Sequence, residues 1–150
     1  MKKGQKGFTL PELLITVAIT GLIVSFLGTA IYQIITITEY SNDRMIAMHE
    51  LQNAAHWFSR DGQMASTASG GSELVLTLPN DSSITYVVVD TELSRTAGEL
   101  QMTLARSISD ISFSIENRII TMSITSSPEG RQNVSEQRTY KVCLRPTEEG

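Results

Sequence analysis

The histidines are the first side chains in this sequence whose spacing could support chemistry. His49 and His56 would share one helix face with Asn53, and two imidazoles placed in this way can bind a metal ion. No third strong ligand accompanies them, so we expect surface histidines and no bound metal. The aspartates are too scattered along the chain to predict a calcium loop; they are Asp81, Asp90 and Asp110.

Cys143 is the only cysteine among the 150 residues, which excludes a disulfide within the chain and a cysteine-based zinc site. It lies in an alternating segment with Val142 and Leu144, where a free thiol is the expected state. A catalytic thiol and an intermolecular disulfide are the alternatives. Because no nucleophile elbow, phosphate-binding glycine loop or paired-carboxylate signature occurs, we expect no enzyme, no cofactor and no small-molecule substrate.

Glu12 is the most unusual ionisable residue, because it is the only charge between Phe8 and Thr38. A carboxylate within a membrane helix costs about 2.5–3.5 kcal/mol at the bilayer centre and less near the edge. Such a residue usually has a positively charged partner. The alternative is that Glu12 lies among the lipid headgroups, where a negative charge favours the N-terminus of a helix.

The segment that must position Glu12 is the uncharged run from Leu13 to Thr38. As a helix, its 26 residues reach roughly 39 Å, which is enough to cross a bilayer core of about 30 Å. Basic residues precede the run, and they are Lys2, Lys3 and Lys6. The positive-inside rule therefore predicts a single-pass protein of the cytoplasmic membrane, with its N-terminus inside and its C-terminal domain outside.

Three interpretations of this N-terminus compete. It could be an uncleaved signal anchor, a secretory signal peptide cut after Ala30, or a leader cut after Gly7. Two observations favour a leader that is cut after Gly7. Glu12 lies at the cytoplasmic edge of the apolar run, where a signal-peptide core would not want a charge, and Gly7–Phe8 sets the smallest residue beside a bulky one.

The run from Lys6 to Leu14 (KGFTLPELL) resembles the prepilin signal of type IV pilins and type II secretion pseudopilins. The resemblance implies that a membrane aspartyl peptidase, the prepilin peptidase, cuts after Gly7 and methylates the new amine of Phe8. It also implies that Glu12, fifth in the mature chain, is the family's characteristic carboxylate, which could meet the amine of a neighbouring subunit. Pro11 fits the first helical turn, where its missing N–H costs nothing.

Gly21, Ser25 and Gly28 form a stripe of small residues at helical spacing within the apolar run. Such a stripe allows close packing between membrane helices. The alternative is that Gly and Ser are simply common in membrane helices.

The rest of the chain predicts an α+β fold in which one long helix packs on an antiparallel sheet. The helix should run from Phe8 to about Met64, and its second half should bury a stripe of Met45, Met48, Leu51, Ala55 and Phe58. Alternating segments predict strands around residues 74–78, 84–88, 93–97, 100–104, 111–115, 120–124 and 140–144. The expected core includes Leu51, Phe58, Leu76, Tyr86, Ile115, Ile124 and Val142.

This gives an expected organisation in five parts: a leader at 1–7 that is removed, a membrane or filament-core helix at 8–38, its amphipathic half at 39–66, a sheet head at 73–145 and a tail at 146–150. The chain has 12 basic and 16 acidic side chains, a formal net charge of -4, so nucleic-acid binding is disfavoured. Loss of the leader would remove three lysines and leave nine basic side chains against 16 acidic ones.

We therefore expect a structural subunit of a type IV pilus, competence or type II secretion filament, with the membrane, the prepilin peptidase and other pilins or pseudopilins as partners. Four short segments resemble the J-type minor pseudopilins and similar minor pilins: Arg60-Asp61, Ile84-Thr85-Tyr86, Leu93-Ser94-Arg95 and Val142-Cys143-Leu144-Arg145. A major pilin is less favoured, because the cysteine pair of many major pilins is missing. The alternative function is a bitopic membrane sensor or binding protein with an extracytoplasmic α+β domain.

Overall fold

The computed structural model describes residues 7–130 and 133–146. The chain divides into two compact units, residues Met1–Thr38 and Glu39–Gly150. Helix α1 (Leu10–Met64) provides the described helix of both units. It confirms the predicted helix, which begins two residues later than expected and ends where the sequence indicates.

Most of the described part of the first unit is an apolar stretch of α1 whose side chains are largely exposed. A window of 18 residues has a mean hydropathy of 2.2 and no buried residue, as expected of a helix that crosses a membrane. The serine and threonine hydroxyls in this stretch each donate a hydrogen bond to the carbonyl four residues earlier; they belong to Thr16, Thr20, Ser25, Thr29, Thr36 and Thr38. Because these groups are satisfied within the helix, they add little cost in an apolar environment.

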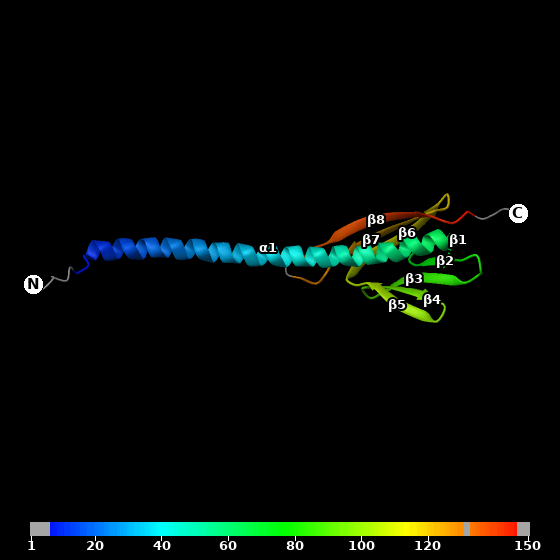
Figure 1. Ribbon diagram of the computed structural model, residues 1–150, viewed down its shortest axis with the longest axis horizontal. Coiled ribbons are helices and arrows are strands. Elements are labelled where there is room, and N and C mark those ends of the chain that lie inside the picture. Colours follow the sequence, from blue (N-terminus) through cyan, green and yellow to red (C-terminus); the bar gives the residue numbers. More distant parts are fainter. Residues whose placement is uncertain (1–6, 131–132, 147–150) are drawn as a thin grey trace, which may run out of the picture. The chain divides into compact units, whose positions relative to one another are not determined.

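The second unit packs the C-terminal half of α1 against two antiparallel sheets (Figure 1). One sheet has the order β1-β2-β3-β4-β5, and the other has the order β6-β7-β8. The strands are β1 (Thr67–Ser69), β2 (Leu74–Thr77), β3 (Ser83–Val89), β4 (Glu92–Ala97), β5 (Leu100–Ala105), β6 (Ile108–Glu116), β7 (Ile119–Ser126) and β8 (Glu136–Cys143).

The antiparallel α+β fold is confirmed, but the expectation of a single sheet was wrong. Strand alternation shows which face of a strand is buried and does not identify its pairing partner. Strand β1 was also missed, because its sequence Thr-Ala-Ser lies in the segment 65–72 that reads as a polar linker. It pairs with β2 from Thr67 opposite Thr77 to Ser69 opposite Val75.

The buried face of α1 consists of small and large residues in alternation: Ala47, Leu51, Ala54, Phe58, Asp61 and Gly62. Leu51 and Phe58 were expected there, whereas Met45 is 66% exposed and Met48 and Ala55 are only half-buried. The predicted stripe was therefore rotated around the helix. Gly62 explains part of the difference, because a Cβ at this position would overlap the side chain of Val142 on β8.

The remaining predicted core is largely confirmed. Leu76, Tyr86, Ile124 and Val142 are buried, but Ile115 is only half-buried beside them. Two side chains of α1 also hold the end of β5. The Asn53 amide donates to the Leu104 carbonyl over 2.5 Å, and the Arg106 amide donates to the Glu50 carboxylate over 2.7 Å.

Several polar residues serve as turn formers. Asn117 and Arg118 both have positive φ, at 48° and 65°, between the paired residues Glu116 and Ile119. This is the backbone of a two-residue hairpin loop, and asparagine is one of the residues that tolerate the positive φ of its first position. Asp81 and Asp90 also adopt positive φ, which gives both aspartates a role in turns.

Candidate functional site

The Gly7–Phe8 junction lies immediately before α1, in non-helical backbone. Phe8 is 81% exposed, and a Cβ built on Gly7 would meet no atom within 4 Å. The peptide bond between these residues is therefore accessible and free of regular hydrogen bonding. Lys2, Lys3 and Lys6, the predicted leader charges, lie outside the described residues.

Thr9 and Glu12 form the N-terminal cap of α1. The Glu12 carboxylate accepts from the Thr9 amide over 3.1 Å and from the Thr9 hydroxyl over 2.9 Å. A glutamate at the third helical position that reaches back to the capping residue is half of a capping box. The negative charge also lies in the first turn, where it favours the positive end of the helix dipole.

Pro11 occupies the second position of the helix, as the sequence indicated. Its missing N–H is no loss there, because the first amides of a helix have no intrahelical acceptor. The Leu13 amide donates to the Thr9 carbonyl over 3.2 Å. Thr9, Pro11 and Glu12 together fix the start of α1 two residues after the Gly7–Phe8 bond.

The small-residue stripe is open. No atom lies within 4 Å of a Cβ built on Gly21 or Gly28. The Ser25 hydroxyl donates to the Gly21 carbonyl over 2.9 Å and so presents little polarity to a neighbour. The stripe thus offers a face on which a second helix could approach closely.

A charged network in the head was missed by the sequence reasoning. Asp61 on α1 is completely buried, and its carboxylate accepts from the Tyr86 hydroxyl on β3 over 2.5 Å. The Arg95 guanidinium on β4 donates to both carboxylate oxygens of Asp61, from Nε over 2.5 Å and from Nη2 over 3.1 Å. The network joins the helix to two strands of the five-stranded sheet.

The environment of this network keeps Tyr86 neutral and Arg95 charged. Burial, followed by the hydrogen bond to Asp61, raises the pKa of Tyr86 far above its ordinary value. The hydrogen bonds to Asp61 raise the pKa of Arg95. Trp57 is close to two guanidinium groups, since Arg95 lies 4.9 Å and Arg60 5.0 Å from its ring centroid. The network can hold the head together, and its paired charges leave no free nucleophile or base.

The other residues that the sequence singled out for possible chemistry do not form a shared site. His56 lies edge-on to Trp57 at 6.0 Å between ring centroids, while Asn53 is engaged with β5. Within residues 7–130 and 133–146, no three His, Cys, Asp or Glu side chains gather into a group that could hold a metal ion. Cys143 is a free, exposed thiol at the end of β8.

A comparison with protein families identifies the N-terminal segment. Residues 2–28 match the prokaryotic N-terminal methylation motif, which is the prepilin-type signal of type IV pilins and pseudopilins. No curated protein and no solved structure matches the chain. The match covers the Gly7–Phe8 junction, the Glu12 cap and the small-residue stripe.

Proposed function

We propose, from the prepilin-type signal at residues 2–28, that this chain is a minor pilin or pseudopilin, a structural subunit of a type IV pilus, competence or type II secretion filament. The observation that carries the proposal is the exposed Gly7–Phe8 bond directly before an apolar helix capped by Glu12. This arrangement suits a precursor that is cut once and then packs its helix against other helices.

Processing would proceed at the cytoplasmic face of the inner membrane. The prepilin peptidase removes residues 1–7, whose lysines hold the leader inside, and methylates the amine of Phe8. Residues 8–38 then form the helix that is stored in the membrane and later enters the filament core. Residues 39–66, the two sheets that begin with β1 at Thr67, and the tail at 146–150 form the head outside the membrane.

Assembly would use Glu12 a second time. In the unprocessed chain its carboxylate caps its own helix through Thr9. Cleavage creates a protonated amine on Phe8, and in a staggered filament the amine of one subunit could meet Glu12 of its neighbour. Pairing would neutralise both charges in the apolar core, where an unpaired carboxylate is costly.

The J-type minor pseudopilins are the subtype that we infer. Three of the four short segments that resemble this group supply the members of one buried network, Asp61, Tyr86 and Arg95. Because these segments are far apart in the sequence and meet in one network, they support a head architecture like that of the J-type minor pseudopilins. The network therefore strengthens a resemblance that is otherwise scattered along the chain.

The test is Gly7→Leu in cells that also produce a prepilin peptidase. A bulky side chain should prevent the leader from entering the peptidase site, so the variant should stay in the membrane as an uncut precursor. Gly4→Leu makes the same change in the leader away from the junction and should be processed normally. If Gly7→Leu is shortened as fully as the unaltered chain, or if the unaltered chain keeps Met1 as a bitopic sensor would, the proposal fails.

A further inference from the structure

Two short motifs for N-linked glycosylation occur in the head. The pattern Asn-X-Ser or Asn-X-Thr, in which X is not proline, is found at Asn80-Asp81-Ser82 and at Asn133-Val134-Ser135 and nowhere else in the sequence. In this modification the asparagine side chain is joined to a sugar, which requires a surface loop. Because so short a pattern often arises by chance, the surroundings of each motif decide whether it can be used.

The first motif forms the turn between β2 and β3. Thr77 pairs with Ser83 across the turn, and residues 79–83 are all exposed. The Leu78 amide closes the turn by donating to the Ser82 carbonyl over 2.9 Å. Figure 1 shows the turn projecting beyond the two strands that it joins. The motif is therefore presented at a tip of the head, where an enzyme can reach it.

The two recognised side chains of this motif contact each other. The Asn80 side-chain oxygen accepts from the Ser82 hydroxyl over 2.7 Å and from the Ser82 amide over 3.3 Å. Neither side chain forms a hydrogen bond with any other residue in the part of the chain that the structure describes. A transferase could therefore bind both side chains without breaking a contact to the rest of the head.

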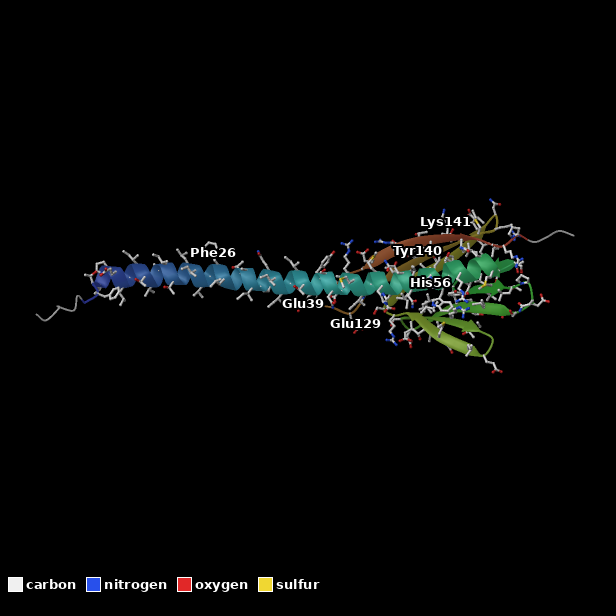
Figure 2. The ribbon with its side chains drawn as sticks, viewed as in Figure 1. Phe26, Glu39, His56, Glu129, Tyr140 and Lys141 are labelled. Atoms are coloured by element: carbon white, nitrogen blue, oxygen red, sulfur yellow. The ribbon has the colours of Figure 1, made fainter. Side chains whose placement is uncertain are left out.

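The second motif is held against the head. Val134, between its two polar residues, is only 4% exposed. The Ser135 hydroxyl accepts from the Ser127 hydroxyl over 3.0 Å. The same loop passes close to α1, where a Cβ on Gly130 would overlap a carboxylate of the helix, and Figure 2 labels Glu129 of this loop beside the helix. This motif would have to leave these contacts to enter an enzyme.

We propose that Asn80 is an acceptor for N-linked glycosylation and that Asn133 is not. The donor is an oligosaccharide joined through a pyrophosphate to a polyprenyl lipid. Transfer forms a bond between the Asn80 Nδ2 atom and C1 of the first sugar. The bond between C1 and the pyrophosphate oxygen breaks, the lipid pyrophosphate leaves with the electron pair, and the amide loses one proton to a base of the transferase.

The inference rests on one part of the proposed function, which is the position of the head outside the membrane. N-linked transfer takes place on that side, and the single span keeps the head near a lipid-linked donor. Neither cleavage after Gly7 nor assembly is required. A chain without sugar but with a methylated Phe8 would reject this inference alone, whereas a glycosylated chain that keeps Met1 would reject the filament role alone.

The test uses the full protein purified from the membranes of the cells that naturally produce it. Cleavage after lysine and arginine places the two motifs on separate peptides, residues 61–95 and 132–138. Mass spectrometry with electron-transfer fragmentation, which leaves sugars attached, then locates the modified atom. We expect a hexose or N-acetylhexosamine chain on Asn80 and an unmodified Asn133.

Matched variants produced in the same cells separate the motif from its surroundings. Asn80→Gln should remove the added mass, and Asn133→Gln, the same change at the second motif, should leave it unaltered. Ser82→Ala should lower the occupancy of Asn80 at least tenfold, because the motif loses its hydroxyl. Ser82→Thr keeps a hydroxyl and should retain the sugar.

Four results would overturn the inference. The first is an unmodified Asn80 in the protein from its own cells. The second is a sugar on a serine or threonine hydroxyl of residues 61–95 in place of Asn80. The third is an Asn80 occupancy that survives Ser82→Ala. The fourth is an Asn133 that is glycosylated as fully as Asn80, which would show that the surroundings do not select between the motifs.

Discussion

At the scale of single residues, Glu12 is the side chain whose role would change most between the precursor and the proposed mature subunit. In the precursor it accepts from the backbone and hydroxyl of Thr9. In the proposed filament it also meets the amine of a neighbouring Phe8. The cap needs only an acceptor, whereas the pairing needs a negative charge, so the two roles can be separated by substitution.

Glu12→Gln and Glu12→Leu make this separation. Gln keeps a carbonyl that can accept from Thr9, and Leu removes both the acceptor and the charge. If charge pairing drives assembly, both variants should be cleaved normally and both should be lost from sheared filaments or from co-purified partner subunits. Recovery of Glu12→Gln in filaments at the level of the unaltered chain would show that the carboxylate acts only as a helix cap.

The Asp61–Tyr86 hydrogen bond makes a prediction for the stability of the head. Tyr86→Phe should lower the free energy of unfolding by about 1.5–3 kcal/mol, because it removes a donor from a buried charge. Chemical denaturation of the head at pH 8 measures this cost. Tyr40→Phe, at an exposed tyrosine, is the control and should change the free energy little.

Tyr86 also determines the direction in which the stability of the head changes with pH. The raised pKa of Tyr86 keeps its proton on in the folded head, whereas an unfolded tyrosine loses its proton near pH 10. The contribution of Tyr86 to stability is therefore complete below about pH 10 and falls above it. Between pH 8 and 10.5 the unaltered head should lose more stability than Tyr86→Phe. Equal losses would contradict the assigned shift.

Residue types and positions predict processing at the Gly7–Phe8 junction and a role for Glu12 in assembly, and both stay predictions. The cap itself could also have been found, since Thr9 followed three residues later by Glu12 is a known signature of a helix start. The role of Asp61 could not be predicted from the sequence in this way. Its partners lie 25 and 34 residues further along the chain, so only the folded sheet reveals why a carboxylate lies on the buried face.

At the scale of elements, the helix was predicted well and its buried face less well. Hydropathy favours Met45 and Met48, but close packing against a sheet favours small side chains between large ones. The helix therefore buries Ala47 and Ala54 and brings Gly62 against Val142. A face chosen by hydropathy alone is displaced wherever small residues make the closest contacts.

For the strands, the sequence pattern identified the elements and did not identify how they pair. Alternation located seven of the eight strands, because each buries one side of a pleated backbone. The division into two sheets depends on which strands form hydrogen bonds with one another. That information is tertiary, and it explains why the single sheet expected from the pattern was wrong.

At the scale of the whole molecule, the division between Thr38 and Glu39 predicts an independent head. A fragment that begins at Tyr40 should be soluble, folded and monomeric in dilute solution, because it lacks the apolar span and keeps the buried face of α1 on its sheets. Calorimetry should show one cooperative unfolding transition. Precipitation or a gradual melt would mean that the core depends on residues before Tyr40.

The central claim concerns how the chain begins in its mature form. Intact-mass analysis of the protein purified from membranes that contain a prepilin peptidase tests it most directly. The account predicts the mass of residues 8–150 with one methyl group added at the amine of Phe8. A mass that corresponds to residues 31–150, or to a chain that still begins with Met1, would contradict it.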